Sequence, residues 1–143
     1  MTHASHAWIP IALMIAGLPC AAGAAERAKA EIACRPGPEV LQYDCTIKLV
    51  GARTGAPLTK VKLTVGADMP SMPMMHNVPP VKADPTGEPG TFRAVLELEM
   101  HGDWALQLNI AGAVRDRVIK TLRFEQGGVV ESTRAQPPRQ RKR

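Results

Sequence analysis

Apolar and polar residues alternate along most of the chain between residues 41 and 124. Because successive side chains of a β-strand point to opposite faces of the sheet, each alternating run predicts a strand with one apolar face. Five such runs are present, and a shorter strand is expected near Ile32. The apolar positions of the five runs are Leu41, Tyr43, Cys45, Ile47 and Leu49; Val61, Leu63 and Val65; Phe92, Ala94, Leu96, Leu98 and Met100; Trp104, Leu106, Leu108 and Ile110; and Val118, Leu122 and Phe124.

The remaining sequence contains no run with the periodicity of an amphipathic helix. Short strands separated by turn residues, each with one polar face, are typical of two packed antiparallel sheets. The sequence therefore predicts an all-β fold, an antiparallel β-sandwich of about six to seven strands. Residues 69–90 contain six prolines and no alternation, so we expect a long stiff loop there. A loop of this length inside a domain is usually functional or disordered.

The beginning of the chain, residues 1–25, differs from the rest in composition. Residues 8–18 form an uncharged apolar run, and a stretch of small residues follows. This order is typical of a secretory signal peptide, whereas a membrane-spanning helix needs about 20 apolar residues. We expect cleavage after Ala24 or Ala25, which predicts a periplasmic or secreted protein. Acylation of Cys20, as in a lipoprotein, is disfavoured because a proline precedes it.

Two cysteines, Cys34 and Cys45, remain after removal of this leader. An even count in an oxidising compartment indicates a disulfide, and the turn-forming residues between the two can bring two strands together. Closing a loop of this length stabilises the fold by about 3 kcal/mol in the chain-entropy description. A redox pair or a metal-thiolate site is the other hypothesis, but CxxC spacing is absent and exported thiols oxidise. We therefore predict a structural disulfide bond.

The chain carries 18 Lys and Arg against 13 Asp and Glu, a net charge of +5. Residues 127–143 hold five of the basic residues and one acidic residue, so residues 26–126 have a net charge of only +1. We expect residues 26–126 to form the folded domain and residues 127–143 to be a basic, disordered tail. The alternative role for the tail is a weak electrostatic contact with the envelope surface. Nucleic-acid binding is not expected, since no basic face interleaved with aromatic residues is present.

A methionine cluster is the main chemical signal of the sequence. Met69, Met72, Met74 and Met75 fall close together, and His76 follows directly. Thioether sulfur is a soft, neutral donor suited to Cu(I), and imidazole accepts either oxidation state of copper. Unlike a thiolate, a thioether is not lost to disulfide formation in an oxidising compartment. The cluster predicts a copper site with Met72, Met74, Met75 and His76 as ligands.

The prolines within the cluster affect the expected arrangement of its donors. Pro70 and Pro73 favour polyproline II, in which three residues make one turn, so Met69, Met72 and Met75 are expected on one side. The alternative is packing, because flexible methionine side chains fill gaps and the loop could cover the open end of the core. Met69 continues the inward series of the preceding strand and is itself expected in the core.

Met100 and His101 are neighbours on a predicted strand, so their side chains should face opposite sides. We expect Met100 in the core and His101 on the surface. Either residue can join the metal site only if the end of this strand meets the methionine loop, the segment that contains Met69 to His76.

Groups suited to catalysis are few. A Ser–His–acid triad would need Ser71 or Ser132 with one of the two histidines beyond the leader, and no nucleophile elbow surrounds either serine. Glu97 and Glu99 share the polar face of a predicted strand, where solvated carboxylates are expected. No glycine-rich phosphate loop is present. The sequence therefore predicts a non-catalytic protein.

Three motifs together resemble the YtkA-like domain family, which is related to the periplasmic part of FixH-type proteins. They are MPSM at residues 69–72, PGTF at residues 89–92 and MHGDW at residues 100–104. The resemblance extends over residues 39–125 and implies an immunoglobulin-like β-sandwich in the cell envelope. It also implies a role near copper handling, metal efflux or haem-copper oxidase assembly.

The methionine motif of the family carries over to Met69 and Met72, and at most to Met74. Pro73 departs from the small flexible residue that many relatives have at this place, and no FixH-type membrane helix is expected.

Two functional hypotheses follow. In the first, the chain is an exported, non-catalytic envelope protein that binds copper, with Cu(I) favoured, or hands it over to copper-handling or metal-efflux proteins. In the second, it is a non-catalytic protein-interaction module in which the methionine loop is packing or a partner contact. Specific binding of Cu(I) is expected in the first case only.

Overall fold

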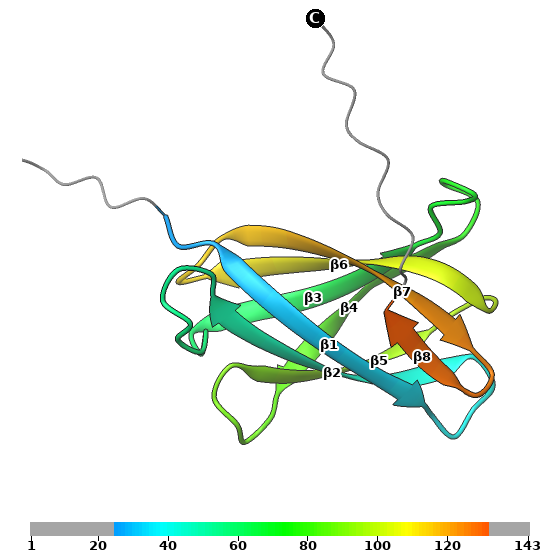
Figure 1. Ribbon diagram of the computed structural model, residues 1–143, viewed down its shortest axis with the longest axis horizontal. Coiled ribbons are helices and arrows are strands. Elements are labelled where there is room, and N and C mark those ends of the chain that lie inside the picture. The colour runs from blue at the N-terminus through cyan, green and yellow to red at the C-terminus, as the bar shows by residue number, and fades with distance from the viewer. Residues whose placement is uncertain (1–24, 132–143) are drawn as a thin grey trace, which may run out of the picture.

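A computed structural model describes residues 25–131 and contains eight β-strands and no helix in this range (Figure 1). The predicted signal peptide lies outside the described residues, apart from Ala25. Within the described range, no helix has the length and apolar character needed to cross a membrane. The strands are β1 (Ala28–Pro36), β2 (Gln42–Gly51), β3 (Val61–Asp68), β4 (Asn77–Pro85), β5 (Thr91–Glu97), β6 (Gly102–Gly112), β7 (Asp116–Glu125) and β8 (Gly128–Glu131).

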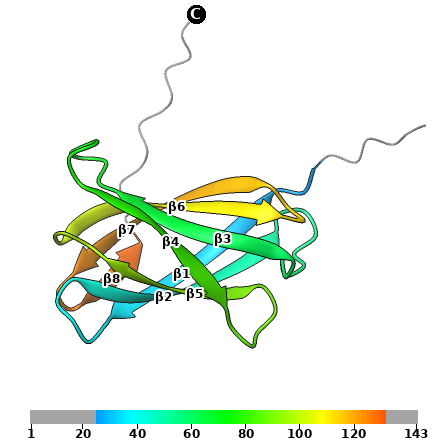
Figure 2. The ribbon, with the colours of Figure 1, turned by 180° about the vertical axis from the view of Figure 1, so that it is seen from behind.

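All strand pairs are antiparallel, and the strand order is β1-β2-β5-β4-β3-β6-β7-β8. Strand β4 connects the two layers, because its first part pairs with β3 and its last residues pair with β5. One layer contains β1, β2 and β5, and the other contains β3, β6, β7 and β8 (Figures 1 and 2). The predicted all-β sandwich is therefore confirmed, with eight strands in place of six to seven.

The inward faces of the two layers form one apolar core. The alternating residues predicted to face inward are buried or half-buried, and Trp104, Phe124 and Ile47 are among the largest fully buried side chains. The rings of Tyr43 and Phe124 meet edge to face with their centroids 4.8 Å apart, and the Tyr43 hydroxyl donates to the Glu125 carbonyl at 3.2 Å. This contact joins β2 to the end of β7, so it ties one layer to the other.

The prediction of a long loop over residues 69–90 is wrong, because β4 lies within it. Only Val78 and Ala83 of this strand are buried, so its alternation is weak. Two prolines, Pro79 and Pro80, stand where the register with β3 shifts between Val65 and Ala67. Proline lacks the N–H that a regular ladder needs, and a bulge is one of the few places in a sheet that accepts it. The prolines therefore mark an irregularity in a strand and not the absence of one.

The start of the expected disordered tail also needs correction. Residues 128–131 form β8, which pairs with β7 through the partners Phe124–Val129 and Leu122–Glu131. With only two apolar residues, this segment shows too little alternation to be recognised from sequence. The remainder of the tail, residues 132–143, lies outside the described residues.

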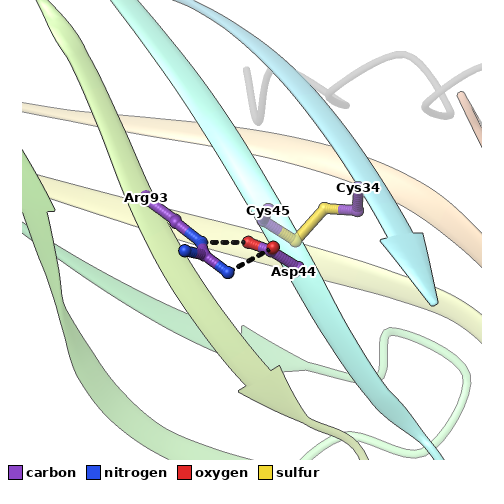
Figure 3. Close-up of a disulfide and its surroundings, with 4 residues drawn as sticks. All are labelled: Cys34, Asp44, Cys45 and Arg93. Atoms are coloured by element: carbon purple, nitrogen blue, oxygen red, sulfur yellow. Dashed lines mark hydrogen bonds and ion pairs between the residues drawn. A yellow bond between two sulfur atoms is a disulfide. The ribbon is translucent and has the colours of Figure 1, made fainter. Parts of the chain in front are cut away.

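The predicted disulfide joins the first two strands. Cys34 and Cys45 are direct partners in the register of β1 and β2, with their Cα atoms 4.0 Å apart (Figure 3). Next to Cys45 on β2, Asp44 accepts two hydrogen bonds from the guanidinium of Arg93 on β5, at 2.7 and 2.6 Å. Because neighbouring residues of a strand face opposite sides, the disulfide lies toward the core and the ion pair lies on the outer face.

Candidate functional site

The methionine loop, residues 69–76, connects β3 to β4 at one end of the sandwich. The turn between β5 and β6 lies at the same end, on the right in Figure 1, as expected when every strand is antiparallel to the next along the chain. Two contacts join the loop to this turn. The His76 Nδ1 atom is hydrogen-bonded to Glu99 Oε2. The methyl carbon of Met69 lies 3.2 Å from the place that a Cβ atom on Gly102 would take.

Hydrogen bonds fold the methionine loop into two consecutive turns. The Met72 N–H donates to the Met69 carbonyl at 3.0 Å, and the Met75 N–H donates to the Met72 carbonyl at 3.2 Å. A third bond, from the Met69 N–H to the His76 carbonyl at 3.3 Å, closes the base of the loop. The predicted polyproline II conformation is wrong, because that helix has no internal hydrogen bonds. Each proline instead occupies the second position of a turn, where its fixed φ is equally suitable.

Burial separates the four methionines into two groups. Met69 is 3% exposed and belongs to the core, as the inward series of β3 indicated. The exposed fractions of Met72, Met74 and Met75 are 38%, 90% and 76%. Packing therefore accounts for Met69, whereas Met74 and Met75 stand in solvent and Met72 is partly covered. The expected position of Met69, Met72 and Met75 on one side of the loop stays a prediction.

Met74 adopts a left-handed backbone conformation, with φ at +67°. It stands at the third position of the second turn, where a positive φ normally requires Gly or Asn. Its side chain lines a shallow hollow of about 260 Å³ together with Asp68, Asn77 and Gln107. The Oδ1 atom of Asp68 is buried and receives no hydrogen bond from the residues that the structure describes. A backbone strained as at Met74 often accompanies function, so the second turn is a candidate functional segment.

Among the candidate metal ligands of the loop, His76 is the one whose side chain is paired with another residue in the part of the chain that the structure describes. Its side chain is 24% exposed, and the carboxylate that it meets, Glu99, is 52% exposed. The two residues are 23 positions apart in the chain. Sequence reasoning assigned Glu99 to a solvated face, and no local signal could have found this contact, because it depends on how two hairpins meet.

The turn between β5 and β6 is fixed by the tryptophan of the MHGDW motif. The Trp104 indole N–H donates to the Met100 carbonyl at 3.1 Å, and Trp104 itself is fully buried. Met100 is half-buried against the core and His101 is exposed, in line with the expectation for each. The end of the strand does meet the methionine loop, through Glu99 and Gly102.

No group of three or more His, Cys, Asp and Glu side chains within residues 25–131 is placed to hold a metal ion. A metal site on the methionine loop would therefore need thioether ligands. The exposed sulfurs and the His76 imidazole provide donors of the kind that copper accepts.

Comparison with known protein families gives a match. The model of the YtkA-like family matches residues 24–109, which include the methionine loop, the β5–β6 turn and most of β6. No curated protein and no solved structure matches the chain.

Proposed function

The chain belongs to the YtkA-like family, and from the loop that it exposes we propose that it is an exported, non-catalytic envelope protein that binds copper or hands it over. Cu(I) is the favoured form, and Met72, Met74, Met75 and His76 are the proposed ligands. The proposed location is the periplasm or the outside of the cell. A disulfide between Cys34 and Cys45 agrees with an oxidising compartment.

The exposure of the loop methionines is the observation that carries this proposal. Burying a methionine side chain fully is worth about 1.5–3 kcal/mol, so a cluster that served packing would not leave two neighbouring methionines in solvent. Met74 and Met75 contribute almost nothing to packing at exposed fractions of 90% and 76%. Their sulfur atoms are instead available to a soft cation. This favours ligation over packing as the reason for the cluster.

The chemistry of the donors suits transfer of the ion as well as binding. Thioethers and a neutral imidazole need not lose a proton to bind Cu(I), so ligand exchange with another protein is not coupled to deprotonation. Because the loop is open to solvent, an acceptor protein can reach the ion before the last thioether has left. Copper is therefore cargo in this proposal, and the acceptors are copper-handling or metal-efflux proteins of the envelope.

The experiment is an anaerobic titration of the mature protein with Cu(I) against a competing chelator. We expect stoichiometric binding by the parent and at least a tenfold loss of affinity in the double variant Met72→Leu, Met75→Leu, because Leu lacks the sulfur lone pairs. Both side chains are exposed, so the double variant should keep the melting temperature of the parent. Met69→Leu is the matched control, since it removes a buried sulfur and nearly conserves volume. Equal binding by the parent and the double variant would exclude this site.

A protein-interaction module is the second candidate. The observation that favours it is again the exposure of Met74 and Met75, because flexible methionines adapt well to the surface of a partner. This hypothesis predicts no specific Cu(I) binding by the parent. It also predicts that Met75→Leu keeps partner binding while Met75→Glu abolishes it, since an apolar contact needs no sulfur.

A further inference from the structure

The contact between His76 and Glu99 determines which ring nitrogen of the histidine is free. An ionised carboxylate can only accept hydrogen bonds, so the Nδ1 atom of His76 must carry the proton in its bond with Glu99 Oε2. In a neutral imidazole one nitrogen is protonated and the other keeps its lone pair. In the neutral form of His76, the lone pair therefore lies on Nε2.

Hydrogen bonds fix the backbone at or next to both partners of this contact. The carbonyl of His76 accepts from the Met69 N–H at 3.3 Å, which closes the methionine loop. On the other side, the residues before and after Glu99 are both fixed. The Leu98 N–H donates to the Leu41 carbonyl at 2.9 Å, and the Met100 carbonyl accepts from the Trp104 indole at 3.1 Å.

The contact also bridges a separation between two strands. β4 and β5 pair only through Asp84–Arg93 and Pro85–Phe92, which lie near the other end of the sandwich. Toward the methionine loop the two strands diverge, as Figure 2 shows, so the start of β4 and the end of β5 share no ladder there. The His76–Glu99 pair joins the two hairpins across this opening.

We propose that Glu99 is a positioning residue: it holds His76 in the tautomer with the proton on Nδ1 and presents Nε2 to the metal. A carboxylate behind a ligating histidine fixes the orientation of the ring and strengthens the other nitrogen as a donor. The tautomer follows from the geometry alone, whereas the role toward copper rests on the function proposed above. Glu99 is thus a member of the site that the methionine motif does not include.

The tautomer can be measured without metal. In long-range ¹H–¹⁵N spectra of the apo protein at about pH 8.5, where an unperturbed imidazole is neutral, His76 should show a protonated Nδ1 and an unprotonated Nε2. Glu99→Ala should shift His76 toward protonation at Nε2, the tautomer that a free imidazole side chain prefers in water. The exposed His101 serves as an internal reference in every spectrum.

Glu97→Ala is the matched control. Glu97 is an exposed glutamate two positions earlier on β5, so its removal changes the net charge equally and should leave the tautomer of His76 unchanged. A parent spectrum with the proton on Nε2 of His76 would overturn the inference, whatever copper does.

An anaerobic Cu(I) titration against the competing chelator tests the role of Glu99 toward the metal. Loss of an outer carboxylate typically lowers metal affinity about 10–100-fold, so we expect Glu99→Ala to weaken binding by this factor, with Glu97→Ala close to the parent. Equal affinities of Glu99→Ala and the parent, with the tautomer changed, would overturn the role toward the metal. If the parent has the expected tautomer but binds no copper, the proposed function fails and the assignment of the tautomer stands.

Discussion

Methionine serves two purposes in this chain, and burial distinguishes them residue by residue. Met69 packs beneath the β5–β6 turn, with its methyl group against Gly102, whereas Met74 and Met75 stand in solvent and Met72 is partly exposed. The MPSM and MHGDW motifs therefore meet at Met69 and Gly102. Met69 is therefore part of the core, and the proposed ligands are the more exposed methionines that follow it.

The structure explains why position 90, in the PGTF motif, is a glycine. Its φ is +71°, and a Cβ atom on it would lie 2.7 Å from the Leu49 carbonyl oxygen and 2.8 Å from a carbon of Pro57. We expect Gly90→Ala to lower the free energy of unfolding by more than about 2 kcal/mol, from left-handed strain and overpacking together. Urea denaturation would measure this loss.

Gly87 provides the control for this prediction, since it lies in the same connection between β4 and β5 and a Cβ atom on it would meet no other atom within 4 Å. Gly87→Ala should change the stability by less than about 0.5 kcal/mol. Similar effects of the two substitutions would contradict this explanation of Gly90.

At the scale of elements, the second turn of the methionine loop is strained at Met74. A non-glycine residue in the left-handed region costs roughly 1–2 kcal/mol, and glycine loses about 0.5–1 kcal/mol through backbone entropy. Because the Met74 side chain is 90% exposed, its removal forfeits little packing. We expect Met74→Gly to raise the stability by about 0.5 kcal/mol or more, measured by thermal or urea unfolding.

Met75→Gly is the matched comparison for this turn. Met75 is also exposed but is not among the residues with positive φ within the described range. This variant should lose about 0.5 kcal/mol, because only the entropic cost of glycine remains. Destabilisation by Met74→Gly of the same size would show that the turn is not strained in solution.

At the scale of the whole molecule, Asp116 connects the start of β1 to β7. Its carboxylate accepts from the Ala28 N–H at 2.8 Å, across 88 positions of the chain. This bond is the main reason that the pKa of Asp116 lies below its ordinary value; the Arg117 N–H and the charge of Arg27 lower the pKa further, against the effect of burial. Asp44, bonded by Arg93, also has a lowered pKa.

A lowered carboxylate pKa makes the stability dependent on pH in one direction. The stabilisation by Asp116 is complete above the pKa of an unfolded aspartate, about 3.9, and is lost as the pH falls through the lower pKa of the folded state. We expect Asp116→Asn to lower the free energy of unfolding by about 1–2 kcal/mol at pH 7. The difference in unfolding free energy between the variant and the parent should be smaller below about pH 4. Urea denaturation over this pH range would test it.

Asp84→Asn is the control for the pH dependence, because Asp84 lies on β4 with a side chain that is 73% exposed. It should change the stability by less than about 0.5 kcal/mol at each pH. A difference between Asp116→Asn and the parent that stays constant down to pH 3 would rule out ionisation of Asp116 as its cause.

Much of the fold follows from patterns that are local in the sequence. A strand repeats every two residues, so five alternating runs were enough to predict five of the strands, their inward faces and the core position of Met69. The disulfide was predictable for a similar reason, because a short turn brings Cys34 and Cys45 into register. Strands β4 and β8 escaped prediction since prolines interrupt the alternation of one and the other is too short to show any.

For the candidate site, too, some features follow from neighbouring residues and others depend on the tertiary structure. The types of donor on the methionine loop, and the core position of Met69, are properties of neighbouring residues and were readable from the sequence alone. The two turns, the exposure of Met72, Met74 and Met75, and the pairing of His76 with Glu99 were decided by the tertiary structure. That pairing joins residues 23 positions apart, at a place where β4 and β5 diverge, and so depends on how the two layers pack. Alternation specifies which face of a strand is buried, but it contains no information on which hairpin ends will meet.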